Sequence, residues 1–299
     1  MAASKLPLAK VTIQQLEYLD AVTSFATWGA AAEYLQVSPS ALSQGLSELE
    51  RRLGVSIFES HGRKKRIAED AAPVLGYARR VLADTREVTD WAERRRSGQV
   101  GALRVGMIDV GAVHHYPHVL AAFRDEHPDV ELRLTVSPSQ TLLDQLVAGE
   151  LDLVVGVSPE SPHPELTTVN LFVEPLAVYA PAGTRIGRVD TWGPWVTFPA
   201  NSLTRRLIET ELRSRGATFE VVAESNQPDV LREMVNLSLG WTVLPAVQAE
   251  TGERPLQRAL KQPLTTRQIG ASHRASSSNP LVGGLLQSMV EHGSLSGKK

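Results

Sequence analysis

The chain has 299 residues, of which 42% are hydrophobic, so it is long enough for about two domains with apolar cores of their own. It contains no cysteine, which excludes disulfides, thiol nucleophiles and zinc-thiolate sites. Residues 1–100 carry 14 Lys and Arg against 12 Asp and Glu, and the remainder carries 17 against 21, which excludes a broad basic surface as the basis of nucleic-acid binding.

Three short helices are predicted within residues 12–54. The first follows Thr12, which has the capping-box spacing with Gln15. The second follows Thr27, a suitable N-cap residue. The third follows Ser38, with Pro39 at the first helical position, where the missing N–H would have no partner in any case. A tight turn at residues 36–37 is expected to join the second helix to the third.

The third predicted helix has two chemically different sides. Its leucines lie within about 60° of one another on a helical wheel, whereas the opposite side carries Ser40, Ser43, Gln44 and Ser47. Solvated helix faces usually favour Glu, Lys and Arg, and short hydrogen-bonding groups suit a helix that enters the major groove of DNA. The pattern therefore predicts a helix-turn-helix. We expect Gly45, beside the buried side, to let a neighbouring helix approach closely.

A small basic hairpin and a long helix are predicted next. Residues 57–58 and 67 flank a turn at residues 60–62, and the hairpin carries Arg63, Lys64, Lys65 and Arg66. Residues 70–96 then place small or apolar side chains at positions 74, 78, 81, 85, 88 and 92, which is a heptad seam. We expect this helix to pair with a second copy of itself; packing on its own chain is the alternative.

Strands and helices alternate from residue 102 onward. Strands are predicted at 102–108, 130–137, 151–157, 176–183, 195–200, 219–225 and 241–247, and helices at 118–128, 141–150, 203–216 and 229–240. Alternation with nearly continuous apolar strands predicts a parallel sheet covered on both faces. Two such α/β units in series predict two Rossmann-like lobes with a ligand cleft between them.

The N-terminal region resembles the winged helix-turn-helix of LysR-type transcriptional regulators. The matching positions are Ala31, Ala32, Leu35, Val37, Ser38, Ala41, Leu42, Ser43, Leu49, Glu50, Leu53, Gly54, Ile57, Phe58 and Glu59, and later Gly240, Trp241, Leu244 and Pro245. The resemblance covers essentially the whole chain. It implies a winged helix-turn-helix at 1–68, a linker and dimerisation helix at 69–97, and an effector-binding domain at 98–299 with a fold like a type II periplasmic binding protein. Its first lobe would span about 101–165 and 267–299, and its second about 166–266.

The resemblance also implies how the protein acts. Such regulators are dimers of dimers that bind double-stranded DNA at an interrupted dyad near a promoter, and RNA polymerase is an expected further partner. The residues expected to face DNA are Thr27, Ser38, Pro39, Ser40, Ser43, Gln44 and Ser47, with Arg63, Lys64, Lys65 and Arg66 in the wing. The family commonly has Arg where this chain has Gln44, so phosphate attraction would fall mainly to the wing.

A small-molecule effector of unknown identity is expected between the lobes. By resemblance, its contacts would come from Asp109, Gly111, Ser139, Phe198, Asn201 and Ser225. Helix N-termini aimed at the cleft favour an organic acid, whereas Asp109 would repel an acid and attract an amine. Both an acid and an amino-bearing or neutral effector stay open. Local roles are the alternative for Ser139, which could cap a helix, and for Gly111, which could permit a turn.

Other functions find less support in the residues. His114 and His118 have the spacing of one helix face, but no cysteine or adjacent carboxylate completes a metal site, so we expect no metal. The glycine-rich stretch at 106–111 lacks the ending of a phosphate-binding loop, and no catalytic motif is found. We therefore expect no enzyme activity and no cofactor. A small-molecule binding protein without a transcriptional role and an α/β enzyme with an added helical domain are the alternatives.

The location expected from the sequence is the cytoplasm. The first 20 residues lack an apolar segment of the signal-peptide type. No stretch reaches about 18 continuous apolar residues, the length that crosses a bilayer. We therefore expect neither export nor contact with a membrane.

Overall fold

The computed structural model describes residues 10–61, 64–97, 101–159, 161, 163–277 and 279–296. The chain forms two compact units, with the change from one to the other at residues 96–97. Within the described residues, no helix combines the length and the apolar character needed to cross a membrane.

The N-terminal unit contains the predicted helices and hairpin. Its elements are α1 (Ile13–Ser24), α2 (Trp28–Tyr34), α3 (Pro39–Leu53), β1 (Phe58–His61), β2 (Lys64–Ile67), a 3-10 turn (Glu69–Ala71) and α4 (Ala72–Ser97). The predicted caps are confirmed: Thr12 forms a capping box with Gln15, and the side chains of Thr27 and Ser38 each accept a backbone hydrogen bond from their helix. Local sequence therefore determines where these helices begin.

The core of this unit joins the helices of the helix-turn-helix to the first half of α4. Leu42, Leu46 and Leu49 of α3 are buried together with Ala78 and Leu82 of α4. Further along α4, Val88 is 65% exposed and Trp91 is 58% exposed. The first half of the predicted heptad seam therefore packs against helices of the same chain, whereas the second half is exposed to solvent.

Gly45 lies where α1 and α3 come close together. A Cβ atom at this position would meet the Cδ2 and Cε2 atoms of Tyr18 at 2.6 Å. Tyr18 is itself buried in α1, so its ring has little room to move. The geometry agrees with the expectation that glycine permits a close approach here. The helix then ends at Gly54, whose left-handed φ of 71° forms the C-cap.

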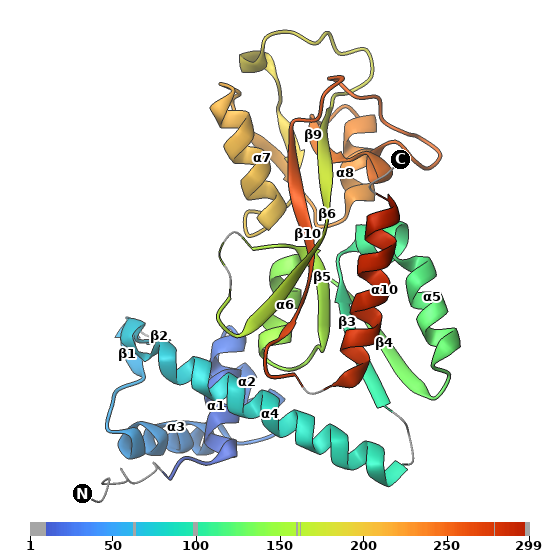
Figure 1. Ribbon diagram of the computed structural model, residues 1–299. Coiled ribbons are helices and arrows are strands. Elements are labelled where there is room, and N and C mark those ends of the chain that lie inside the picture. Colours follow the sequence, from blue (N-terminus) through green and yellow to red (C-terminus); the bar gives the residue numbers. More distant parts are fainter. Residues whose placement is uncertain are drawn as a thin grey trace, which may run out of the picture. The chain divides into compact units, whose positions relative to one another are not determined.

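The C-terminal unit is built on a mixed sheet in the order β4-β3-β5-β10-β6-β9 (Figure 1). The strands are β3 (Gly101–Met107), β4 (Val130–Val136), β5 (Leu153–Val157), β6 (Leu166–Tyr179), β9 (Thr242–Pro245) and β10 (Thr265–Arg274), and a second sheet pairs β7 (Trp195–Thr197) with β8 (Val221–Glu224). The expected parallel pairing holds for β3 with β4 and β5 and for β7 with β8. It is wrong for β6, β9 and β10, which pair antiparallel with their neighbours.

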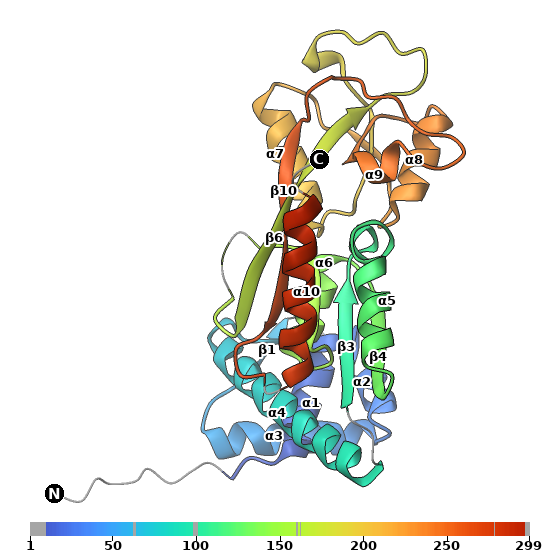
Figure 2. The ribbon, with the colours of Figure 1, turned by 45° about the vertical axis from the view of Figure 1, so that its right-hand side comes forward.

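Helices cover both faces of the first lobe. They are α5 (Pro117–Glu126), α6 (Ser139–Val147) and α10 (Pro280–Ser296), and the second lobe holds α7 (Leu203–Ser214), α8 (Pro228–Asn236) and α9 (Ala246–Ala249). Helix α5 connects β3 to β4, and α6 connects β4 to β5 on the other side of β3. The two connections run in opposite directions across the sheet, so right-handed crossovers place α5 and α6 on opposite faces. Figure 2 shows α10 beside α5 on one face and α6 behind the sheet.

Two apolar cores define the lobes, and the long strands β6 and β10 belong to both. In β6, Phe172 packs against the first core and Leu176 lies in the second. Ile269 of β10 lies in the first core, and Leu264, directly before β10, lies in the second. The lobes therefore meet at residues 173–175 and 265–268, somewhat later along β6 than residue 166, where we expected the boundary.

Candidate DNA-binding surface and effector pocket

The polar side of α3 is open to solvent as the sequence pattern predicts. Ser40, Gln44 and Ser47 are exposed and Ser43 is half-buried, while three leucines of the opposite side, at positions 42, 46 and 49, are fully buried. Thr27, Ser38 and Pro39, which precede or begin helices α2 and α3, are also exposed. The hydroxyl groups of Ser38 and Ser40 lie 3.0 Å apart. Ser40, Ser43, Gln44 and Ser47 thus offer short donors and acceptors on this side of the helix.

The basic hairpin is attached to the end of α3 by a carboxylate. The Glu50 Oε1 atom accepts hydrogen bonds from the backbone N–H groups of Ile57 (2.7 Å) and Phe58 (3.1 Å). Arg66 in β2 is exposed and lies opposite Glu59 in the strand register. The backbone of β2 includes Lys64 and Lys65, but their side chains and all of Arg63 lie outside the described part of the chain.

The arginines at the end of α3 are engaged within the helix. Glu48 accepts hydrogen bonds from Arg51 Nε and Arg52 Nε, each at 2.6 Å. These hydrogen bonds hold the pKa of the Glu48 carboxyl down at about 2. Glu48 offsets one of these two positive charges, so the hairpin, with four basic residues in its sequence, is the larger source of positive charge for phosphates.

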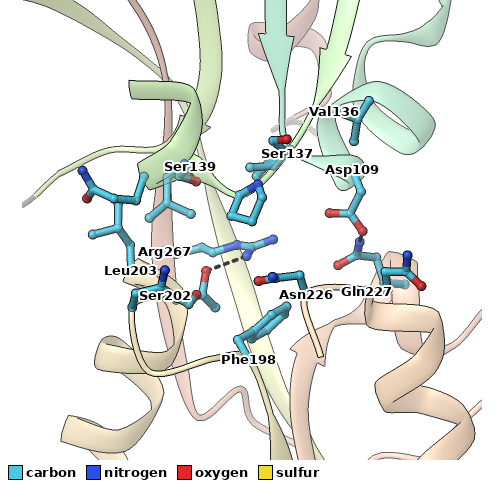
Figure 3. A pocket seen from close by; sticks show the side chains of 17 residues that line it. Asp109, Val136, Ser137, Ser139, Phe198, Ser202, Leu203, Asn226, Gln227 and Arg267 are labelled. Atoms are coloured by element: carbon cyan, nitrogen blue, oxygen red, sulfur yellow. Dashed lines mark hydrogen bonds between the residues drawn. The ribbon is translucent and has the colours of Figure 1, made fainter. Parts of the chain in front are cut away.

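A cavity of about 270 Å³ lies between the two lobes of the C-terminal unit (Figure 3). The first lobe lines it with residues that end or directly follow β3, β4 and β5, namely Ile108, Asp109, Val136, Ser137, Pro138, Ser139, Gln140 and Val157. The second lobe contributes Phe198, Asn201, Ser202, Leu203, Thr204, Asn226, Gln227 and Gln248, which follow β7, β8 and β9, and Arg267 comes from β10. The cavity thus lies at the carboxyl ends of parallel strands, where open α/β sheets bind ligands.

Four of the six expected effector contacts line this cavity. Asp109, Ser139, Phe198 and Asn201 do so, but Gly111 and Ser225 do not. Gly111 is buried at the start of a π-helical turn (Gly111–His115), so its role is to form the turn.

Ser139 and Ser225 have local hydrogen-bonding roles. The Ser139 hydroxyl accepts a hydrogen bond from the Val157 N–H, so this side chain both lines the cavity and fixes the end of β5. Ser225 itself does not line the cavity, but its hydroxyl accepts a hydrogen bond from the Gln227 N–H and so shapes the loop whose next residues, Asn226 and Gln227, do.

The sequence did not point to Arg267, the most strongly connected side chain of the cavity. It lies opposite Glu174 in the strand register, where the two lobes meet. Its Nη2 atom is 2.6 Å from Glu174 Oε2, and both side chains are only 5% exposed. Arg267 Nη1 also donates to the Thr204 hydroxyl at 2.8 Å, and Glu174 Oε1 is 2.8 Å from His115 Nε2. This network connects β6, β10 and the start of α7.

Four other residues that line the cavity were also absent from the predicted effector contacts, although they follow predicted strands closely. Ser202, Leu203 and Thr204 begin α7, and Gln248 lies in the short helix after β9. They could have been predicted from the tendency of open α/β sheets to bind ligands at the carboxyl ends of their strands. Arg267 had no such signal, because no strand was predicted at residues 265–274.

The two carboxyl groups near the cavity shift in opposite directions. Burial raises the pKa of Asp109, although Arg267 and the hydrogen bond from Gln248 act against the rise. Burial also acts to raise the pKa of Glu174, but the Arg267 charge and the His115 and Arg267 hydrogen bonds lower it below its ordinary value. Glu174 is thus held as the anion, whereas ionisation of Asp109 is opposed.

The histidines His114 and His118 do not share a helix face. His114 lies in the π-helical turn, and Tyr116 separates this turn from α5, which contains His118. The expected geometry is therefore wrong, because Pro117 begins a new helix. Across the residues that the structure describes, no three His, Asp or Glu side chains gather as a metal site.

Comparison with known proteins agrees with both units. Residues 13–71 match the bacterial regulatory helix-turn-helix protein family of the LysR type, and residues 96–294 match the LysR substrate binding domain. The RuBisCO operon transcriptional regulator of Allochromatium vinosum is 28% identical over 243 residues, which cover 78% of this chain and 79% of the relative.

Solved structures of similar proteins share the fold. A full-length OxyR variant from Pseudomonas aeruginosa has a TM-score of 0.57 at 23% identity, covering 94% of this chain and 98% of that one. Full-length CbnR complexed with its target DNA has a TM-score of 0.51 at 20% identity, covering 94% and 99%. With a LysR-type helix-turn-helix in front of a LysR substrate-binding domain, the chain belongs to the LysR family of DNA-binding transcriptional regulators with an effector-binding domain.

Proposed function

We propose that the polar side of α3 reads base edges in the major groove while the β1–β2 hairpin contacts phosphates. The observation that carries this proposal is the division of α3 into a buried leucine side and an exposed side of Ser40, Gln44 and Ser47. Short side chains of this kind reach base edges without steric hindrance. CbnR, which shares the fold, has been solved with its target DNA.

The protein acts on DNA as a dimer of dimers at an interrupted dyad, with RNA polymerase as a further partner. The exposure of the seam residues Val88 and Ala92 in the second half of α4 supports pairing between copies. Its place of action is the cytoplasm, because its DNA target lies there. The position of the cavity at strand ends of the substrate-binding domain supports ligand binding, and we expect no catalysis, metal or cofactor there.

The effector occupies the cavity between the lobes and changes the spacing of the DNA-binding units. Because β6 and β10 run through both lobes, a ligand that contacts both sides favours one arrangement of the lobes over another. Regulation of this kind requires the effector to bind one arrangement of the assembly more tightly than the other.

Fluorescence anisotropy with the full-length protein tests the DNA-binding proposal. The probes are the DNA upstream of its own gene and a scrambled duplex, each at two salt concentrations. We expect selective binding of the upstream DNA that weakens steeply with salt. Equal affinity for the two duplexes would refute the proposal.

Two pairs of variants separate base reading from phosphate contact. Gln44→Ala or Ser43→Ala is expected to reduce the preference for the upstream DNA, with Gln287→Ala on the exposed side of α10 as the control. Lys64→Ala is expected to weaken both duplexes alike and to reduce the salt slope by about one, with Lys261→Ala as the charge-matched control. Equal losses on both duplexes for Ser43→Ala would show that the reading surface is wrongly assigned.

A further inference from the structure

We propose that the effector is a small zwitterion, with its cationic nitrogen at Asp109 and Gln248 and its carboxylate at the first turns of α6 and α7. This inference rests on the proposed function, because it assigns a chemical class to the ligand of the same cavity. The Asp109 carboxylate favours a cation, whereas the helix N-termini favour an anion. A zwitterion satisfies both preferences, because its ammonium group and its carboxylate lie at opposite ends of the ligand.

The Asp109 end of the cavity contains a carboxylate and one acceptor that lacks a donor. Gln248 is 4% exposed and donates from Nε2 to Asp109 Oδ2 at 2.9 Å. Its Oε1 atom is buried and has no hydrogen-bond partner. Leaving such an acceptor unsatisfied costs free energy that a ligand N–H group would recover. An ammonium group placed here offsets the charge of Asp109, and a small turn of the buried Gln248 amide lets Oε1 accept from it as well.

The opposite end presents donors. Ser139 begins α6, and Ser202 is the N-cap of α7, so the first turns of two helices of nine and twelve residues border the cavity. Free N–H groups at helix N-termini attract anions. Figure 3 shows Ser139, Ser202 and Leu203 on the side of the cavity away from Asp109, with Arg267 between them. The two ends are therefore spatially separate.

The charges of the site favour a ligand with both signs. Arg267 is the one positive side chain among the lining residues, and Glu174 already pairs with it. A simple anion would add charge to a site that holds Asp109 and Glu174 against a single guanidinium. A simple amine would leave the helix N-termini without an anion. A zwitterion satisfies both ends and adds no net charge.

The cavity volume limits the size of the ligand. A volume of about 270 Å³ is many times the roughly 10–15 Å³ of such space that one water molecule needs. This space accommodates a molecule of amino-acid size. Phe198, which also lines the cavity, offers an aromatic surface for an apolar side chain of the ligand.

The test is a binding panel on the full-length protein by thermal shift and titration calorimetry. The probes are the proteinogenic L-amino acids, β-alanine and γ-aminobutyrate, each compared with its deaminated acid and its decarboxylated amine. For valine, these partners are 3-methylbutanoate and isobutylamine. We expect at least one zwitterion to bind, and we expect removal of either charged group to weaken binding roughly ten- to hundredfold.

Matched variants assign the two ends. Asp109→Asn is expected to weaken the zwitterion at least about tenfold, while Asp129→Asn, on an exposed loop, leaves binding unchanged. Thr204→Val removes the hydroxyl beside Arg267 and is expected to weaken the zwitterion and its deaminated acid alike. Thr210→Val, exposed on the same helix, is its control. The melting temperature of each unliganded variant shows whether it is folded.

Several outcomes would overturn the inference. They are an acid or amine that binds as tightly as its zwitterion, an Asp109→Asn variant with unchanged affinity, and a panel with no binder. Anisotropy on the upstream DNA with the same preparations separates this failure from that of the proposed function. If selective DNA binding persists, only the ligand class is wrong; if it is absent, the proposed function fails whatever the panel shows.

Discussion

The Glu174–Arg267 pair joins the two lobes, and removing its members one at a time tests how. Both side chains are 5% exposed, and they lie opposite each other on β6 and β10. Breaking a buried pair by losing one partner costs about 3–5 kcal/mol, whereas replacing both partners with apolar residues is often neutral. We therefore expect Glu174→Met to be severely destabilising.

The two single substitutions differ in what they leave behind. Glu174→Met leaves a buried guanidinium, which cannot lose its proton, and we expect a cost of about 4 kcal/mol. Arg267→Met leaves a carboxylate that keeps the His115 hydrogen bond and can take up a proton, so we expect about 3 kcal/mol. The double substitution is expected to be more stable than either single one.

Hydrogen exchange measured by mass spectrometry suits this double-mutant cycle, because it reports local stability. A chain with two units does not unfold in one transition, so a single global free energy of unfolding is not defined for it. Peptides from β6 and β10 report the local opening free energy, and about 3 kcal/mol corresponds to roughly hundredfold faster exchange. Peptides from α1 and α3 are the internal control. Additive losses in the double variant would refute the reasoning, because they would show that the two charges are not coupled.

Other predictions concern both units. Gly45→Ala is expected to lower the thermal stability by about 1 kcal/mol, because a methyl group 2.6 Å from the Tyr18 ring costs about 1–3 kcal/mol and the gain in helix propensity returns about 1. Gly76→Ala in α4, where a Cβ meets only the end of an arginine side chain at 3.6 Å, is expected to be neutral or stabilising; equal effects would contradict the close approach. Glu50→Ala leaves two backbone N–H groups of the hairpin without their acceptor, so a loss of about 2 kcal/mol is expected, with weaker binding to specific and random DNA alike by anisotropy. Asp109→Asn is expected to raise the melting temperature at pH 7. The raised pKa of Asp109 means that the folded state binds the carboxyl proton more tightly than the unfolded state does. Ionised Asp109 therefore destabilises the fold above the folded pKa, and this destabilisation disappears below the ordinary pKa of 3.8. A difference in melting temperature between Asp109→Asn and the parent protein that grows as the pH falls would contradict this sign.

The N-terminal unit was predictable because its signals are local. Thr12, Thr27 and Ser38 mark helix starts through hydrogen bonds to residues three positions away. The apolar period of α3 fixes its buried side, since a helix has one face to bury. Even the role of Gly45 could be proposed from its position on the wheel, although its contact with Tyr18 needed the structure.

Four elements of the C-terminal unit were not predicted in full from the sequence. They are residues 166–175 of β6 and all of α9, β10 and α10. In β10, the buried positions include Arg267, Ser272 and Arg274, so the usual apolar alternation is missing. The helix α10 contains three glycines, which lower local helix propensity, and packing on the sheet overrides that preference.

Local pattern determined the helix starts, the exposed polar side of α3 and the strand ends that carry four of the expected effector contacts. Tertiary structure alone decided the antiparallel crossing of β6 and β10, the Glu174–Arg267 pair between them and the unsatisfied Gln248 beside Asp109. These features depend on residues 93 to 139 positions apart in the chain. A local pattern carries no information about such partners, because the free energy of a buried charge is set by what folding brings next to it.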